Sequence, residues 1–216
     1  FFSGKRRFED KALWHIELAD GTLVTSRNIV NAGGMWANDI ARLTGHELPM
    51  VIVEAQFADL EPDGPIPDMP AVTDHASTFY LRKNGDKYFF GAFDPFDKVV
   101  IREEWMRRGV PPEGAQNIKP DFSRISEAYD KACLLIPSIK NAKVTPKAAA
   151  ICMTPDGYPL VGPFAKNYWV AAGFMDGVTS GGGLGKYLAD WMVDSQPPME
   201  LCDTDANRYD RWATRE

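Results

Sequence analysis

The stretch that most constrains how this chain can fold lies near its C-terminal end, at residues 168–191. Residues 168–172 have the pattern of a short buried strand, and the residues after it are rich in glycine. The pattern predicts a strand, a glycine-rich turn and the start of a helix. Such a turn directs free backbone N–H groups and the positive end of a helix dipole at one point, which suits an electron-rich ligand oxygen. The glycines would let that ligand approach the backbone closely.

Two familiar glycine motifs do not match this stretch. A phosphate-binding loop requires glycine where Ser180 stands and serine or threonine where Tyr187 stands. The dinucleotide fingerprint also fails, because Gly181 and Gly183 are followed by Lys186 where its third glycine belongs. Two interpretations therefore remain open: a ligand-binding loop, or a packing loop whose glycines only bring the helix close to the strand.

Composition excludes several classes of protein. The chain has 216 residues and a formal net charge of −6, which argues against a nucleic-acid surface and leaves room for one large or two small domains. No apolar run approaches a membrane span. Three widely spaced cysteines favour a reducing compartment and argue against a structural zinc site. The three histidines lack ligand spacing, so we expect no metal.

The N-terminal segment has the pattern of half a doubly wound unit. Residues 11–24 predict a hairpin that turns at Asp20-Gly21, and residues 29–34 predict a short strand that ends in glycine. A helix should follow over 36–43, with Trp36, Ile40 and Leu43 on its buried face. Because doubly wound folds place such strands side by side, we expect 28–36 and 168–173 to share one layer.

The middle of the chain is rich in predicted strands. Extended segments are expected at 50–60, 78–81 and 87–93, the last two joined by the Asn84-Gly85 turn, with a proline-rich loop at 61–70. A helix capped by Asp121 should run to about Ile136 and end at Pro137. The fold class is therefore mixed α/β, with nucleotide-type parts at 1–48 and 148–202, a sheet-rich insert at 49–147 and a polar tail at 203–216.

Several segments together resemble one protein family, the FAD-dependent amine oxidoreductases of the D-amino-acid oxidase superfamily. They follow one another in family order over roughly residues 12–212, and the likeness is to the dimethylglycine and sarcosine dehydrogenases. The segments are VNAGGMWA at 30–37, YLR at 80–82, GVPP at 109–112, TPDGYPLVGP at 154–163, the stretch 173–191 and NRY at 207–209.

The resemblance implies part of an FAD-binding doubly wound domain with an inserted, sheet-rich substrate domain. It implies hydride transfer from an N-methylated amino acid to the flavin, with Tyr80 as the catalytic, substrate-orienting residue. The start of the last helix would face the flavin ring where negative charge accumulates on reduction. The implied cofactor-binding residues are Gly33, Gly34, Trp36, Gly173, Phe174, Gly177, Val178, Thr179 and Gly181.

Two departures from the family pattern matter. The sequence contains no G-x-G-x-x-G unit with its acidic ribose-binding residue, so we expect another polypeptide segment to supply the N-terminal FAD-binding half. This chain alone should bind FAD weakly or not at all.

The second departure is local. The dehydrogenases carry histidine and then an aromatic residue on the first central strand, whereas this chain has Ala55-Gln56-Phe57. Tyr80 itself can also be interpreted as a sheet residue whose ring only packs.

Two functions are therefore compared. The first is a part of an FAD-dependent oxidoreductase that acts on dimethylglycine-like or sarcosine-like amines. The alternative is a non-catalytic family relative that serves as a regulatory or structural subunit of a larger complex, which Ala55 favours. By analogy with the family, the location is the mitochondrial matrix or a bacterial cytoplasm, and the substrate is a small amine.

Overall fold

The computed structural model of the protein describes residues 2–3, 13–114 and 117–209, which divide into two compact units. Unit 1 comprises residues 1–52, 102–111 and 151–216, and unit 2 comprises 53–101 and 112–150. The strands are β1 (Phe2–Ser3), β2 (Trp14–Leu18), β3 (Leu23–Ser26), β4 (Ile29–Asn31), β5 (Val51–Glu61), β6 (Val72–Asp74), β7 (Phe79–Asn84), β8 (Lys87–Ala92), β9 (Lys143–Met153), β10 (Leu160–Ala165) and β11 (Tyr168–Ala172). The helices are α1 (Ala37–Leu43), α2 (Glu103–Arg108), α3 (Ser126–Leu135) and α4 (Gly177–Asp194).

Unit 1 contains a three-stranded sheet in the order β10-β11-β4. β11 pairs in parallel with β4, and Val170 lies opposite Asn31. The prediction that these two segments share one layer is therefore confirmed. Because the two strands run in the same direction, the glycines that follow them lie at the same edge of the sheet.

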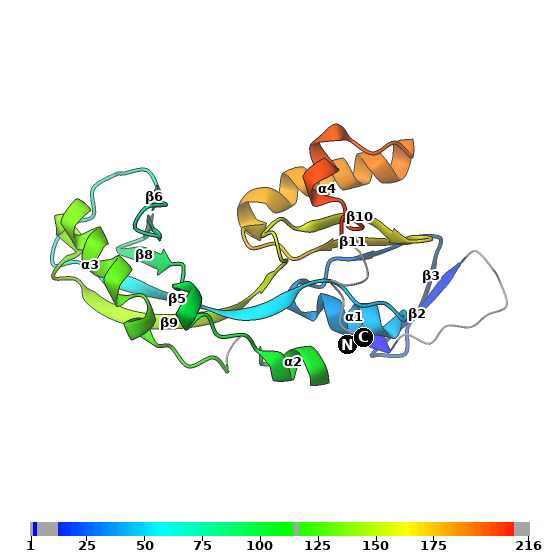
Figure 1. The fold of residues 1–216 in the computed structure, drawn as a ribbon, viewed down its shortest axis with the longest axis horizontal. Coiled ribbons are helices and arrows are strands. Elements are labelled where there is room, and N and C mark those ends of the chain that lie inside the picture. The colour runs from blue at the N-terminus through cyan, green and yellow to red at the C-terminus, as the bar shows by residue number, and fades with distance from the viewer. Residues whose placement is uncertain (1, 4–12, 115–116, 210–216) are drawn as a thin grey trace. The chain divides into compact units, whose positions relative to one another are not determined.

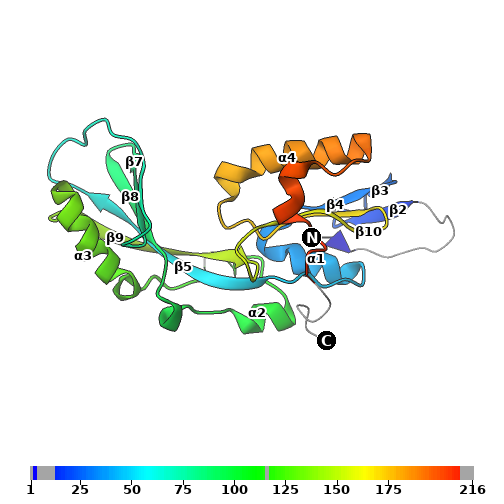
Figure 2. The same cartoon turned by 45° about the horizontal axis from the view of Figure 1, so that its top comes forward.

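Helices α1 and α4 cover opposite faces of this sheet (Figures 1 and 2). Successive residues of β11 point to alternate faces, so Tyr168 and Val170 join the core beneath α1 while Trp169 and Ala171 pack towards α4. The arrangement is a three-layer α/β/α sandwich, as the mixed α/β prediction requires.

The buried face of α1 differs from the predicted one. Ala37, Asn38 and Ala41 are buried, whereas Leu43 is 44% exposed. The alanines are small enough to bring the helix close to the sheet. The Asn38 amide satisfies the Leu48 backbone, donating to its carbonyl (3.1 Å) and accepting from its N–H (2.7 Å). Hydrophobicity alone therefore selected the wrong side of this short helix.

The glycine-rich stretch is also different from its prediction. Only residues 173–176 form the turn, and the glycines from Gly177 onward belong to the 18-residue helix α4. Glycine disfavours helix by about 1 kcal/mol relative to alanine. Burial of Leu184, Leu188 and Trp191 against β10 and β11 offsets that preference.

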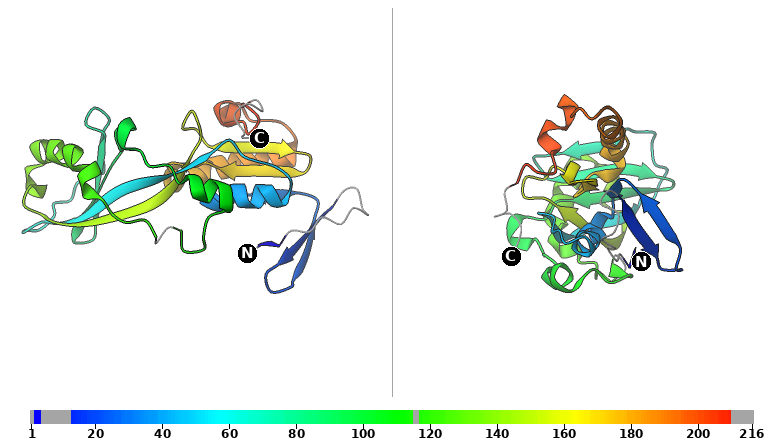
Figure 3. Two further views of the ribbon diagram at one scale, coloured as in Figure 1. Left: turned by 60° about the horizontal axis from the view of Figure 1, so that its bottom comes forward. Right: turned by 90° about the vertical axis from the view of Figure 1, so that its right-hand side faces the viewer.

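The predicted N-terminal hairpin is present. β2 pairs antiparallel with β3, and the turn between them places Gly21 at a φ of +85°. The hairpin is the pair of dark-blue strands in Figure 3. Its Trp14 indole N–H donates to the Asn167 carbonyl at 2.8 Å, which fastens the hairpin to the turn before β11.

Unit 2 is built on a five-stranded sheet in the order β6-β7-β8-β5-β9. β7 and β8 form the hairpin predicted at Asn84-Gly85. One face of the sheet packs against α3, whose Ile125-to-Ile136 stripe matches the predicted apolar face. Phe79, Leu81 and Phe90 supply the sheet side of this core.

A buried ion cluster attaches the start of the α3 segment to the sheet. The Arg124 guanidinium donates to Glu54 Oε2 at 2.6 Å and also binds Asp94. The three side chains are 5–10% exposed. Asp121 accepts from the Ser123 N–H at 3.1 Å, as expected of a cap, although it caps a 3₁₀ turn that precedes the helix.

Two segments differ from their expected assignment. Residues 102–111, which include α2, lie in unit 1 rather than in the central insert. Residues 203–209 belong to the unit 1 core rather than to a tail, since Ala206 is 1% exposed. Within the described residues, no helix has the length and apolarity that crossing a membrane requires.

Candidate functional site

The parallel strand ends of unit 1 bring five of the predicted cofactor-binding residues to one edge of the sheet. Gly33 and Gly34 follow β4 and lead through a 3₁₀ turn, Gly34–Trp36, into α1. Gly173 and Phe174 follow β11 at the same edge. Gly34 and Gly173 have φ values of +56° and +74°, which glycine adopts without strain.

Close packing beneath the edge fixes these turns. A Cβ at Gly33 would lie 2.5 Å from Ile40 Cδ1, and a Cβ at Gly173 would lie 2.8 Å from Thr154 Cγ2. Burial raises the pKa of the Cys152 thiol, while the N–H groups of Gly173 and Phe174 act in the opposite direction.

Helix α4 begins at this edge with Gly177, Val178 and Thr179. Asp176 precedes them, and its carbonyl accepts from the Thr179 N–H at 3.2 Å and the Ser180 N–H at 3.1 Å. The first two N–H groups of the helix have no carbonyl within the helix to which they can donate. The Val178 side chain is fully exposed. The helix start therefore offers backbone donors to an outside acceptor.

Four glycines of α4 have open space where a side chain would stand, judged against the described residues. A Cβ at Gly181, Gly182, Gly183 or Gly185 would have no other heavy atom within 4 Å apart from neighbouring helix backbone. The interpretation that these glycines bring the helix close to the strand is therefore not supported by the structure. Their bare backbone is available to whatever approaches this side of α4.

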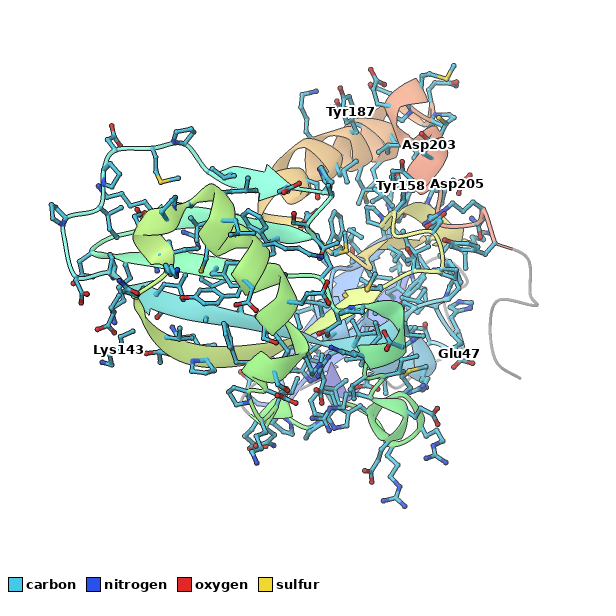
Figure 4. All side chains as sticks on the ribbon, turned by 60° about the vertical axis from the view of Figure 1, so that its left-hand side comes forward. Glu47, Lys143, Tyr158, Tyr187, Asp203 and Asp205 are labelled. Carbon is cyan, nitrogen blue, oxygen red and sulfur yellow. The ribbon has the colours of Figure 1, made fainter. Side chains whose placement is uncertain are left out.

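A polar cluster supports the turn from below. Arg208 Nε donates to Asp156 Oδ2 at 2.8 Å and Nη2 donates to Asp156 Oδ1 at 2.9 Å. The same guanidinium donates to the carbonyls of Tyr158, Pro159 and Asp205. In Figure 4 the labelled Tyr158 and Asp205 lie together. The hydrogen bond from Arg208 holds the pKa of the Asp156 carboxyl well below its usual range.

The side chain of Thr154 connects this polar cluster to the glycine edge. Thr154 Oγ1 donates to the Tyr158 carbonyl at 2.6 Å and contacts Asp156 Oδ1 at 3.1 Å. Its methyl group faces Gly173. The loop 154–159 is thereby fixed between the C-terminal segment and the candidate edge.

Tyr80 lies in unit 2, on the sheet face opposite the α3 core. Its cross-strand neighbour on β8 is Gly91, which in turn lies opposite Phe57 on β5. The Tyr80 ring centroid is 6.0 Å from Phe89 and 6.2 Å from Phe93. Ala55 is two residues from Phe57 and shares its face. The face is half-buried and aromatic.

One hollow of unit 1 is remote from the glycine edge. It has a volume of about 380 Å³ and lies beside the start of β11, at the opposite end of that strand. Its lining residues are Asn28, Pro163, Phe164, Ala165, Lys166, Asn167, Trp169 and Asn207. None of the predicted site residues contributes to it.

A sheet with a glycine-rich edge at the ends of two parallel strands, covered by helices on both faces, is the arrangement of a dinucleotide-cofactor domain. Comparison with known families agrees, since residues 4–191 match the family described as FAD dependent oxidoreductase. The chain belongs to this family. The resemblance deduced from its sequence motifs is confirmed.

The curated relatives refine this assignment. The chain is 34% identical to human mitochondrial dimethylglycine dehydrogenase over 211 residues, which cover 94% of this chain and 24% of that protein. It is 27% identical to mouse mitochondrial sarcosine dehydrogenase, over 90% of this chain and 21% of that protein. Identity is also 27% to 4-methylaminobutanoate oxidase of Paenarthrobacter nicotinovorans, over 89% of this chain and 23% of that protein. The chain thus spans about a quarter of each relative.

Two solved structures show the same fold. L-proline dehydrogenase from P. horikoshii superposes with a TM-score of 0.75 and 19% sequence identity, covering 99% of this chain and 55% of that chain. Glycine oxidase from Geobacillus kaustophilus gives a TM-score of 0.67 at 19% identity, covering 93% of this chain and 50% of that chain. The predicted fold class is therefore confirmed.

Sequence reasoning missed several residues around the candidate site. Arg208 and Asp156 lie 52 positions apart, so nothing local indicates that they pair. Thr154 belongs to the TPDGYPLVGP motif and Cys152 to the three cysteines, but neither was predicted to lie beside the glycine edge. Gly91 left a usable signal, because a glycine inside an aromatic strand indicates close approach of another group.

Proposed function

We propose that this chain is part of an FAD-dependent oxidoreductase that oxidises N-methylated amino acids of the dimethylglycine and sarcosine type. The observation that carries the proposal is the shared edge of β4 and β11, where glycine turns meet the start of a long helix. The 34% identity to dimethylglycine dehydrogenase supports the substrate class.

The residues of unit 1 fit the ring end of a flavin. The bare backbone of Gly181 and its neighbours would admit a flat ring system without steric conflict. The N–H groups of Gly177 and Val178 and the dipole of α4 would stabilise negative charge on a ring oxygen. Gly33, Gly34, Trp36, Gly173 and Phe174 would border the ring at the strand ends.

Unit 2 supplies the proposed substrate-orienting residue. The Tyr80 hydroxyl would hydrogen-bond to the amine substrate, and the rings of Phe89 and Phe93 would exclude water around it. Ala55 lies on the same face, where the dehydrogenases carry histidine, so substrate positioning by a second polar side chain is reduced here.

Bound FAD would supply the acceptor for the hydride that the amine loses. The chain's own residues would bind and orient a neutral amine, and this requires no general base among the proposed residues. The partner is a polypeptide segment that contributes the N-terminal FAD-binding half. The proposed location is the mitochondrial matrix or a bacterial cytoplasm, in line with relatives whose names include mitochondrial enzymes and with a bacterial one.

The isolated 216-residue chain is expected to bind FAD with a dissociation constant weaker than about 1 μM. In the proposed site the described glycine edge would contact the ring, whereas the contacts for pyrophosphate and adenosine would come from the other half. Isothermal titration calorimetry with FAD measures this, with the complete protein as the positive control. A sub-micromolar constant for the isolated chain would contradict the division of the cofactor site.

The substitution Tyr80→Phe in the complete protein should lower kcat/KM for dimethylglycine about fivefold, the worth of one hydrogen bond. The assay is reduction of an artificial electron acceptor, with Tyr158→Phe as a matched control on an exposed tyrosine. Unchanged kcat/KM in Tyr80→Phe would remove this residue from the site. Absence of turnover with dimethylglycine and sarcosine, with FAD bound, would favour the non-catalytic alternative.

A further inference from the structure

The ring of Tyr80 occupies the space above a residue that has no side chain. An ideal Cβ built on Gly91 would lie 2.1 Å from Tyr80 Cζ, 2.2 Å from its Oη and 2.7 Å from its Cε2. These are the three heavy atoms nearest to that position. The hydroxyl end of the Tyr80 ring therefore lies directly over Gly91 of β8.

The backbone at Gly91 does not itself require glycine. Its φ lies outside the left-handed range, in contrast to Gly85 in the nearby turn, whose φ is +66°. Gly91 is paired on both sides within the sheet, with Phe57 on β5 and Tyr80 on β7. A glycine inside a strand weakens the sheet and is typical of places where another group approaches closely. Here the approaching group is the Tyr80 ring.

We propose that Gly91 is a positioning residue that determines where the Tyr80 hydroxyl lies and thereby sets the affinity for the amine substrate. The inference rests on the proposed function, in which that hydroxyl orients the amine. Any side chain at position 91 would displace the ring from its present position beside Phe89 and Phe93. The displaced atoms are the far end of a side chain that can rotate, so the fold should tolerate the change.

The first test monitors the position of the Tyr80 ring by ¹⁹F NMR and does not depend on turnover. The complete protein is labelled with 3-fluorotyrosine, and the Tyr80 ¹⁹F resonance is identified by its loss in Tyr80→Phe. Gly91→Ala should shift this resonance, because the ring moves relative to Phe89 and Phe93. Gly64→Ala is the matched control, since a Cβ there has open space and φ is not left-handed. A Tyr80 resonance unchanged in Gly91→Ala would overturn the proposal.

The second test uses the amine assay. Gly91→Ala should raise KM for dimethylglycine at least about fivefold, the loss expected for one misplaced hydrogen bond, with a smaller change in kcat. In a Tyr80→Ala background, which has no ring to displace, Gly91→Ala should change KM less than about twofold. An equal rise in both backgrounds would overturn the proposal, because the effect would then not pass through Tyr80.

Stability separates positioning from folding. If Gly91→Ala lowers Tm strongly, the Tyr80→Ala/Gly91→Ala double variant should recover it, because the conflict is with the ring. If Tm falls equally in Gly91→Ala and in the double variant, the steric conflict lies with the backbone and the proposal is overturned. If the wild-type protein turns over no amine, the proposed function fails, whereas the ¹⁹F shift still decides whether Gly91 positions the ring.

Discussion

Replacing Arg124 with methionine should lower the free energy of unfolding by about 3–5 kcal/mol, the usual result when one partner of a buried ion cluster is removed. Arg124 lies between Glu54 and Asp94, and all three side chains are at most 10% exposed. Its guanidinium also donates to the Glu54 carbonyl. Without it, two carboxylates remain buried and lose their shared cation, while methionine supplies only apolar volume.

Urea denaturation of the complete protein measures this change. Arg108→Met is the matched control, because Arg108 forms an exposed pair with Glu104 in which its side chain is 81% exposed. Such a surface pair should contribute less than about 1 kcal/mol. A loss below about 1 kcal/mol in Arg124→Met would show that the buried cluster does not hold the α3 segment on the sheet.

Replacing Arg208 with methionine should destabilise unit 1 by about 2 kcal/mol at neutral pH, because charged hydrogen bonds to Asp156 and to three carbonyls are lost. The expected loss of stability is modest because the Asp156 side chain is 38% exposed, so water screens its charge. Arg208 lowers the folded-state pKa of Asp156. The stabilisation is therefore present above the unfolded pKa of about 3.9 and is lost as pH decreases through the folded value.

The difference in stability between wild type and Arg208→Met should accordingly shrink as pH decreases below about 4. Unfolding curves at several pH values test this, with Lys186→Met as a control for an exposed pair, in which Asp190 accepts from Lys186 at 2.6 Å. A difference that stays constant through acid pH would show that the Asp156 carboxylate is not the relevant partner.

Local patterns in the sequence predicted the elements that depend on local chemistry. The Asn84-Gly85 and Asp20-Gly21 turns define their hairpins, and the stripe from Ile125 to Ile136 marks the buried side of α3. The parallel pairing of β4 with β11 was also predictable, because both are short apolar strands that end in glycine. These features need only a few neighbouring residues to specify them.

Features that depend on distant contacts were not predictable. Helix α4 continues through Gly181 because its other face is buried on the sheet. The helix propensity of single residues does not take that burial into account. The buried side of α1 is set by Ala37 and Ala41, whose small size matters only once the sheet is in place. Arg124 and Asp94, 30 positions apart, meet only in the folded unit.

The candidate site divides in the same way. Family resemblance predicted Tyr80 and the strand-end glycines as site residues, but the open surface beside Gly181 became visible only once a side chain could be placed there. The clash between a Cβ at Gly91 and the Tyr80 ring likewise requires coordinates. Glycine roles of this kind follow from the space around a residue, which a single sequence does not specify.

The most direct test of the central claim is anaerobic mixing of the complete protein with dimethylglycine, followed by the visible absorption of its flavin. An FAD-dependent oxidoreductase of N-methylated amino acids should show a flavin spectrum as purified and lose the oxidised band at a rate that rises and saturates with dimethylglycine. Sarcosine should act similarly, whereas trimethylglycine, whose nitrogen has no lone pair, should not. A flavin that stays oxidised with every amine, or a complete protein without flavin, would contradict the account.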